Sequence, residues 1–318
     1  MRKTCIAGLL LLFAAVAPVG GSIAAVSVPT SMSDSDLQLW QKKITEYAQA
    51  GNRVVHVDRQ MESYFRWAED GPKADSKNIN GVPDMTGSFK IILRAAEESG
   101  KTGLKIPELD DALNNLAEKT KAFQEIAEKA RTYYSRKDYL TDNMAAGIAM
   151  HPQLEEAYDA FSEAGDQLKK LQEELTDKIE PVRLAVIEKK YGKEYYWHHM
   201  KIMGDARNVI KFLPDSDDES MQIDAAGYDG AVAAFGQALT EFEEYYTKVG
   251  DEKIGKMAMA TMKPNNFNNF LASSRELSQE LKAPKRDERK LENRINSLVN
   301  AYNNLINRSN STRFKLKK

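Results

Sequence analysis

Apolar residues recur every three or four positions along almost every segment of this 318-residue chain that is longer than ten residues. The first stripe runs from Leu37 to Ala68, and Asp58 occupies the one position where an apolar residue is missing. This spacing matches the 3.6-residue turn of an α-helix, whereas a half-buried strand would alternate every second residue. Ser33 or Asp34 precedes the stripe and is suited to cap a helix. The pattern therefore predicts a long amphipathic helix that begins near residue 34.

Further stripes of the same kind follow. They occupy about residues 88–99, 109–134, 144–179, 191–209, 228–249, 267–281 and 291–305. Pro107 suits the first turn of its helix. The spacing slips at Pro152, where we expect a helix start or a kink, and Pro181 marks a second such point before a helix that runs to about Leu213. No segment alternates for long, so the predicted fold is all-α, an elongated bundle of long antiparallel helices.

The segments outside the stripes suggest simple boundaries. Residues 25–33, "AVSVPTSMS", have no helical pattern and are expected to be a flexible lead-in. Residues 34–308 are expected to form one all-helical domain. Residues 309–318 are rich in basic side chains and lack an apolar face, so we expect a disordered, solubilising tail.

The first 24 residues have the pattern of a secretory signal peptide. Arg2 and Lys3 precede an apolar run, and the small residues Ser22 and Ala24 follow at the spacing that signal peptidase prefers. The run is too short for a membrane span, which takes roughly 20 residues. We expect cleavage near Ala24 and a periplasmic or secreted protein, with no transmembrane segment in the mature chain.

Cysteine usage agrees with this prediction. The chain has one cysteine, Cys5, which lies within the leader, so the mature protein should contain no disulfide and no thiolate nucleophile. A lipid anchor is not expected, because no cysteine follows the apolar run. Without Arg2 and Lys3, 43 basic residues remain against 47 acidic ones, a balance that gives no general attraction to nucleic acid.

Three stretches carry a resemblance to a known family. They are "MESYFRWAEDGP", "ARTYYSRKDYLTDNMAAGIAMHPQLEEAYDAF" and "INSLVNAYNNLINRSN". In order and spacing they resemble the YiiG-like family of bacterial envelope proteins and predicted lipoproteins, which is built on a domain of unknown function, over most of residues 35–310. The resemblance implies a helical secreted or surface protein and assigns no catalytic residue. The absence of a cysteine after the apolar run departs from the lipoprotein members.

The sequence lacks the common catalytic and cofactor motifs. His-Glu-x-x-His, the phosphate-binding Gly-x-x-x-x-Gly-Lys-Ser and Gly-x-Ser-x-Gly are absent, and no histidine has a glutamate three residues before it. We therefore predict no catalytic residue, no bound metal and no cofactor, and a protein that is not an enzyme.

The stretch "EYYWHHMKIMG" concentrates aromatic and histidine side chains. His198 falls on the apolar face of its helix with Tyr195, and Trp197 projects from the other side. Core packing is the favoured interpretation. The alternative is a ligand-binding cluster of Tyr195, Trp197, His198 and His199, with Glu194 and His198 as a weak two-ligand metal site.

The acidic stretch "DSDDE", residues 215–219, is interpreted as a solvated linker rather than a calcium loop, because the glycine that such loops need at the sixth position is missing.

These observations favour an extracytoplasmic, all-helical protein of the bacterial cell envelope that binds or scaffolds without catalysis. Its partner would be an unknown envelope protein or a small ligand. The alternative is a helical-bundle receptor for a small ligand or a metal ion. The oligomeric state and the identity of the ligand are left open.

Overall fold

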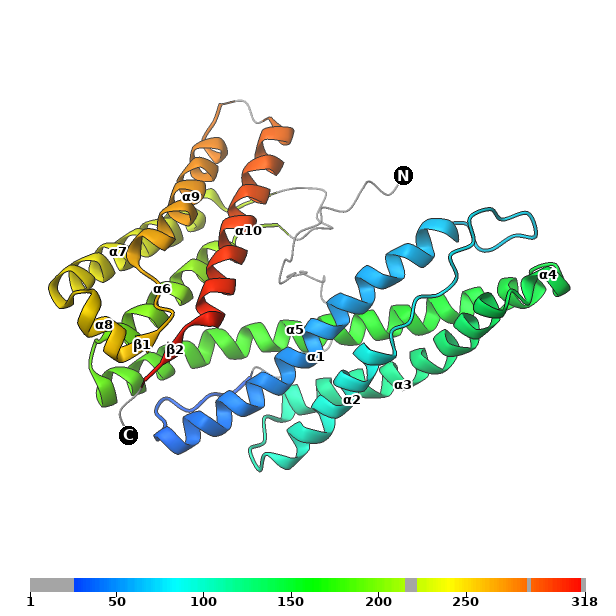
Figure 1. Ribbon diagram of the computed structural model, residues 1–318, viewed down its shortest axis with the longest axis horizontal. Coiled ribbons are helices and arrows are strands. Elements are labelled where there is room, and N and C mark those ends of the chain that lie inside the picture. The colour runs from blue at the N-terminus through cyan, green and yellow to red at the C-terminus, as the bar shows by residue number, and fades with distance from the viewer. Residues whose placement is uncertain (1–25, 215–221, 285–286, 316–318) are drawn as a thin grey trace. The chain divides into compact units, whose positions relative to one another are not determined.

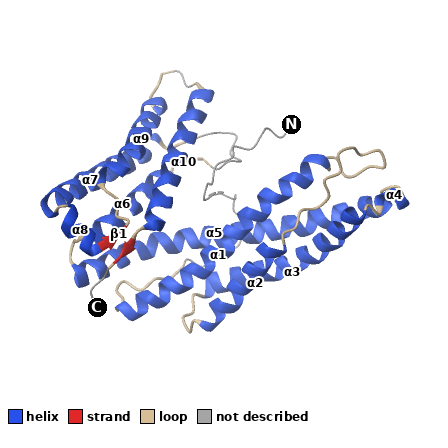
Figure 2. Ribbon diagram, viewed as in Figure 1, coloured by secondary structure: helices blue, strands red, loops and turns tan. Residues whose placement is uncertain are grey.

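The computed structural model describes residues 26–214, 222–284 and 287–315. These residues form ten α-helices, one short 3₁₀ helix and one pair of two-residue strands (Figure 1; Figure 2). The predicted all-α class is therefore confirmed. None of the helices in the described ranges combines the length and the apolar composition needed to cross a membrane.

The elements follow the predicted stripes closely. In chain order they are α1 (Asp34–Trp67), α2 (Thr86–Lys101), α3 (Pro107–Arg136), α4 (Tyr139–Asp142), α5 (Ala145–Tyr191), α6 (Tyr195–Ile210), α7 (Ala225–Val249), α8 (Asp251–Met257), β1 (Ala258–Met259), η1 (Pro264–Phe267), α9 (Asn268–Leu281), α10 (Glu288–Ser311) and β2 (Arg313–Phe314).

The helices group into two compact units, and the boundary falls within α5. The N-terminal unit comprises described residues 26–179, and the C-terminal unit begins at Glu180 and contains the remaining described residues. Each unit has its own apolar core. The sequence predicts a single domain because helical segments follow one another without a long linker. The division into two cores depends on which helices pack against one another, and the apolar period of a helix does not indicate its packing partner.

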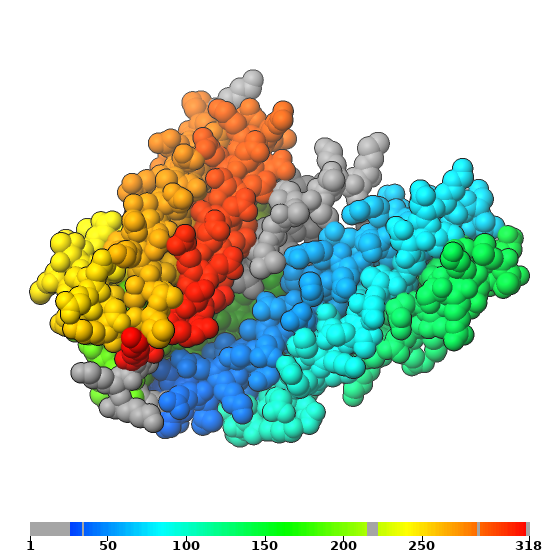
Figure 3. Space-filling view, in the orientation of Figure 1, coloured from blue at the N-terminus to red at the C-terminus, as the bar shows by residue number. Residues whose placement is uncertain are grey.

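Helix α1 begins where the sequence places a cap. The Ser33 hydroxyl accepts a hydrogen bond from the backbone N–H of Asp36, and the Asp36 carboxylate accepts one from the backbone N–H of Ser33. This reciprocal arrangement satisfies amides that the first turn of a helix leaves free. The stripe residues Tyr47 and Met61 are fully buried. In the space-filling view, α1 (blue) lies against α2 (cyan) (Figure 3).

A glycine lets α1 and α5 approach closely. A Cβ atom at Gly165 would lie 2.5 Å from a methyl carbon of Val54, so only glycine fits at this contact. Nearby, Asp58 is the polar interruption of the α1 stripe, and its carboxylate accepts a hydrogen bond from the Tyr158 hydroxyl at 3.1 Å. Burial raises the pKa of Asp58 to about 7, and the neighbouring Asp166 carboxylate adds to this effect.

Neither Pro152 nor Pro181 begins a helix, because α5 runs through both positions. A proline removes one backbone hydrogen bond from a helix, and the burial of the α5 side chains Leu154, Phe161 and Leu168 offsets that loss. The helix ends instead at Tyr191, and the next residue, Gly192, has a φ of +74° in the left-handed region that favours glycine. Of the two alternatives predicted at Pro152 and Pro181, the helix start is therefore wrong, whereas the kink stays a prediction.

The C-terminal unit packs α6, α7, α9 and α10 around an aromatic core. Gly204 of α6 faces the Glu180 side chain, and a Cβ at that position would overlap the Glu180 carboxylate. Burial raises the pKa of Glu180, while the Arg207 guanidinium, 3.8 Å from its carboxylate, opposes that rise. The absence of a side chain at Gly204 thus makes room for the Glu180 carboxylate.

Regular secondary structure continues past residue 308, where the sequence analysis placed the start of the tail. Helix α10 continues to Ser311, and β2 pairs antiparallel with β1, so that Ala258 lies opposite Phe314. The Phe314 ring packs 4.5 Å from the Tyr196 ring. This segment of the sequence is rich in basic residues and has one aromatic residue, Phe314. Its partner Tyr196 lies more than a hundred positions away in the chain.

The predicted signal peptide, residues 1–24, the acidic stretch at residues 215–219 and the last three residues of the tail lie outside the described residues.

Candidate functional site

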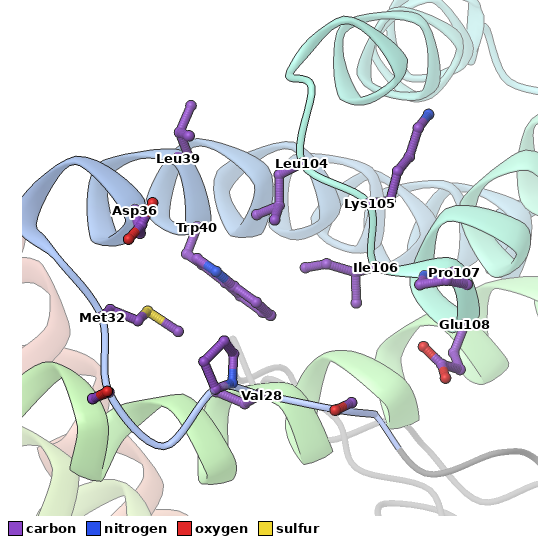
Figure 4. A pocket seen from close by; sticks show the side chains of 13 residues that line it. Val28, Met32, Asp36, Leu39, Trp40, Leu104, Lys105, Ile106, Pro107 and Glu108 are labelled. Carbon is purple, nitrogen blue, oxygen red and sulfur yellow. The ribbon is translucent and has the colours of Figure 1, made fainter.

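The N-terminal unit contains a cavity of about 650 Å³ between the start of α1, the lead-in before it and the connection from α2 to α3. Figure 4 shows the Trp40 indole between Val28, Met32, Leu104 and Ile106. The cavity is lined by Ser27, Val28, Pro29, Ser31, Met32, Asp36, Leu39, Trp40, Leu104, Lys105, Ile106, Pro107 and Glu108. Aliphatic and aromatic side chains dominate this lining, and charged groups stand at its edge.

The lead-in forms one wall of the cavity and is held at its beginning. The Val26 N–H donates to Glu174 Oε1 at 2.9 Å, and the Val26 carbonyl accepts from Lys178 Nζ at 2.7 Å. The Val26 side chain is buried in the core of the unit. The sequence predicts a flexible segment here, whereas the structure ties it to α5 at Val26 and to the α1 cap at Ser33.

The α2–α3 connection forms the opposite wall, and a buried polar network fixes it. The Asp110 carboxylate accepts hydrogen bonds from the Ile106 N–H at 3.1 Å, the Tyr47 hydroxyl at 2.9 Å and the Ser99 hydroxyl at 3.2 Å. Lys43 Nζ lies 2.6 Å from the same carboxylate and donates to the Ser99 carbonyl at 2.8 Å. The network therefore joins α1, the end of α2, and the first turn of α3 directly behind the cavity wall.

The network keeps a charged pair inside the protein. The Lys43 side chain is 0% exposed, so its ammonium depends on Asp110 and Ser99 for the interactions that water would otherwise supply. Burial acts to raise the pKa of Asp110, but hydrogen bonds from Lys43 and Tyr47 outweigh it and hold that pKa below its ordinary value. Burial and the adjacent carboxylate raise the pKa of Tyr47. The carboxylate is ionised and the phenol stays protonated as the donor.

Two carboxylates and one lysine stand at the rim. Hydrogen bonds from the Ser33 side chain and backbone hold the pKa of Asp36 below its ordinary value, so this carboxylate is ionised at neutral pH. Glu108 lies in the first turn of α3. The Lys105 side chain points away from the cavity (Figure 4). Because two helices begin here, the rim carboxylates also face the positive ends of the α1 and α3 dipoles.

The site residues predicted from the sequence lie elsewhere, in the C-terminal unit. The structure buries Tyr195, Trp197, His198 and His199 together at the start of α6. The Tyr195 hydroxyl donates to the Met262 carbonyl at 3.1 Å and accepts from the Met262 N–H at 2.7 Å. The His198 ring lies 4.5 Å from the Tyr245 ring and 5.1 Å from the Trp197 ring. These distances show that the rings pack against one another.

His199 is the more deeply buried of the two histidines, at 1% exposure, although the stripe places His198 on the core face. A hydrogen bond of 2.9 Å joins His199 Nε2 to the Ser309 hydroxyl, and the Phe314 ring lies 5.1 Å away. Burial lowers the pKa of His199 to about 4, and the Arg183 guanidinium contributes to this shift. Both faces of α6 are covered, one by α7 and the other by α10 and β2, so a single-stripe analysis misjudges which ring lies deeper.

Glu194, which the alternative interpretation pairs with His198 as a metal ligand, accepts a hydrogen bond from the Tyr245 hydroxyl at 2.6 Å. Among the residues that the structure describes, no group of three or more His, Cys, Asp or Glu side chains is arranged to hold a metal ion.

The sequence analysis did not identify the cavity. Trp40 belongs to the α1 stripe and looks like any other core position. Four further apolar lining residues stand in short segments without helical period: Val28, Met32, Leu104 and Ile106. Apolar residues in two connecting segments were the signal in the sequence that could have indicated the cavity. Whether the two segments lie side by side depends on the tertiary fold.

The fold and the cavity define an all-α protein with a ligand-sized hollow and without recognisable catalytic motifs. Residues 38–311 match the family described as "Protein of unknown function (DUF3829)", and the chain belongs to this family. It is also 20% identical over 205 residues to the uncharacterized protein YiiG of Escherichia coli K12, which confirms the YiiG-like resemblance. That alignment covers 62% of this chain and 58% of the relative. No solved structure matches the chain.

Proposed function

We propose that this protein is an extracytoplasmic, non-catalytic binding protein of the bacterial cell envelope, and that the cavity beside Trp40 is its binding site. The observation that carries the proposal is a cavity of about 650 Å³ with a mainly apolar lining. Binding pockets for small molecules usually measure about 300–1,000 Å³ and combine an apolar interior with a few polar groups. The cavity beside Trp40 has this size and composition.

The walls of the cavity support the same proposal. A ligand gains most from a site that is arranged before it binds, because the protein then loses little conformational freedom. Hydrogen bonds to Asp110 hold one wall, and the contacts of Val26 with α5 tether the other. The leader pattern of residues 1–24 supports an extracytoplasmic location.

Binding is tested by titrating the exported protein with Nile red, an uncharged apolar dye whose emission rises in an apolar site. We expect saturable binding with one site per chain. Met32→Trp should fill the cavity and abolish the signal. Leu140→Trp places the same side chain at a position on α4 that is 73% exposed and does not line the cavity, and it should leave binding unchanged. Equal binding by the two variants would count against the cavity as the site.

The non-catalytic part has its own test. Ligand that co-purifies with the protein, or that is incubated with it, should be recovered with an unchanged mass. Turnover that depends on the protein would overturn this part.

The extracytoplasmic location is tested separately. A fusion of residues 1–24 to alkaline phosphatase should be active in cells, and the exported protein should begin at Ala25. An uncleaved product in the cytosol would contradict it.

A further inference from the structure

The connection between α1 and α2 contains the single Asn-Gly pair of the chain, Asn80 and Gly81. The pair lies outside the helices, strands and turns of the structure, and the Asn80 side chain is exposed. Among the described residues, no hydrogen bond engages the Asn80 carboxamide or the Gly81 N–H. Neither group is therefore held in place by a hydrogen bond in the folded chain.

We propose that Asn80 is a site of spontaneous deamidation, at which the folded protein converts this asparagine into a mixture of isoaspartate and aspartate. The Gly81 nitrogen attacks the side-chain carbonyl carbon of Asn80 and loses its proton, and ammonia leaves, so that a five-membered succinimide ring forms. Water then opens the ring. Opening at the side-chain carbonyl gives aspartate, whereas opening at the main-chain carbonyl gives isoaspartate, whose main chain runs through the former side chain.

The residue that follows an asparagine decides how readily the ring closes. Gly81 has no Cβ, so its backbone nitrogen is uncrowded and the chain around it adopts conformations that other residues exclude. Asn78 is exposed in the same connection, but the branched side chain of Ile79 crowds the nitrogen that would attack it. Asparagines within α10 precede N–H groups that already bond to the preceding helical turn. The chemistry therefore selects Asn80.

The surroundings of Gly81 determine what the modification does to the structure. The Gly81 carbonyl accepts a hydrogen bond from Trp67 Nε1 at 3.2 Å, and a Cβ at Gly81 would lie 2.8 Å from the Tyr134 Cβ. The rings of Trp67 and Tyr134 themselves lie 5.3 Å apart. Isoaspartate lengthens the main chain before Gly81 by one methylene group and so displaces Gly81 from these partners. The isoaspartyl form should therefore pack its α1–α2 connection less well.

The reaction is tested by incubating the full exported protein at mildly alkaline and at mildly acid pH and digesting samples with trypsin. Cleavage after Lys77 and Lys90 releases residues 78–90, so that Asn78 and Asn80 are compared within one peptide. Mass spectrometry with fragmentation should place the exchange of the amide NH₂ for a hydroxyl at Asn80. The exchange should be faster at alkaline pH, because the attacking nitrogen must lose its proton.

Asn80→Gln is the matched variant, because the longer side chain would have to close a six-membered ring, which forms more slowly. This variant should gain no such mass at residue 80 over the same time. Absence of the mass gain at Asn80, or an equal gain at Asn78, would overturn the proposal.

The structural consequence is tested by comparing two forms that carry the same new charge. Asn80→Asp has the charge without the additional methylene group, and its unfolding temperature should stay within about 2 °C of the parent. The isoaspartyl fraction of the incubated protein, identified by a methyltransferase specific for isoaspartate, should unfold about 1–6 °C lower. Equal unfolding temperatures for this fraction and for Asn80→Asp would overturn the predicted displacement of Gly81.

The deamidation site is independent of the cavity. Trp40 stands near the start of α1 and Trp67 at its end, about 40 Å apart at the rise of an α-helix. The isoaspartyl fraction should therefore bind Nile red as the fresh protein does. Loss of dye binding in that fraction would contradict an effect confined to the α1–α2 connection.

Discussion

The buried polar groups of the two units differ in what surrounds them. In the N-terminal unit, Lys43 and Asp110 form an ion pair whose groups are engaged by hydrogen bonds, and they stand directly behind a cavity wall. In the C-terminal unit, His198 and His199 lie among packed aromatic rings. The second region has the greater density of residues that could do chemistry, yet the first borders a hollow. Chemical composition in a short stretch is thus a poor guide to where a fold leaves space.

The largest effect should come from breaking the ion pair. Asp110→Ala would leave the Lys43 ammonium buried without its carboxylate and free the Ile106 N–H, and we expect a loss of about 3–5 kcal/mol in the free energy of unfolding. The double variant Lys43→Met, Asp110→Leu should recover part of this loss, because no unpaired charge remains, whereas the Ile106 N–H and the Tyr47 hydroxyl still lack their acceptor. Urea unfolding followed by circular dichroism measures both. If Asp110→Ala is as stable as the parent, the hydrogen-bond network of Asp110 does not stabilise the cavity wall.

The next effect concerns pH in the C-terminal unit. His199 has a pKa of about 4 in the folded chain and about 6.5 when unfolded, so the unfolded state binds its proton more readily between these values. This residue should therefore cost about 3 kcal/mol of stability as the pH falls from 7 to 4. His199→Gln should remove that part of the pH dependence. His56→Gln, at an exposed position, serves as the control and should retain it.

Asp58 should show the opposite dependence in the N-terminal unit. Its pKa is raised to about 7 in the folded chain, so the folded state binds the proton more tightly than the unfolded state. Stability should therefore fall as the pH rises from about 4 to 7, by about 1–2 kcal/mol once solvent screening is allowed for. Asp58→Asn, which still accepts from Tyr158, should be more stable than the parent at pH 8 and no more stable at pH 4. Equal stabilities at pH 8 would show that Asp58 is not shifted.

The smallest effect on stability is expected at the mouth of the cavity. Leu39 lines it and is 43% exposed, so Leu39→Asn should change the free energy of unfolding by less than about 0.5 kcal/mol. It should nevertheless weaken Nile red binding by about twofold to fivefold, because apolar surface next to the ligand is lost. Leu140→Asn is the control at an exposed position outside the cavity and should not alter binding. Titration of Leu39→Asn and Leu140→Asn with Nile red at matched protein concentration measures this difference.

Most helices could be predicted from local pattern. The cap at Ser33, one of the two residues expected there, and the helix start at Pro107 were both visible in the sequence. The stripes placed Tyr47, Phe123 and Leu298 correctly in cores. The uninterrupted course of α5 could not be foreseen. A proline weakens a helix locally, but contacts made along the rest of its length decide whether the helix continues.

The candidate site could not be predicted, for a related reason. Val28 and Met32 lie about seventy residues from Leu104 and Ile106, and neither segment has a period that reveals what it faces. The stripe placed His198 on the core face but gave no position for His199, because one stripe defines one face, while α6 is covered on two.

By itself, the sequence determined the all-α class, most helix starts and the leader-like first residues, because capping, helical period and apolar run length act over a few neighbouring positions. Only the tertiary structure decided the two separate cores, the burial of His199 and the cavity beside Trp40. These features arise where side chains distant in the chain either fill the space between helices or leave it open, and local pattern carries no record of that volume.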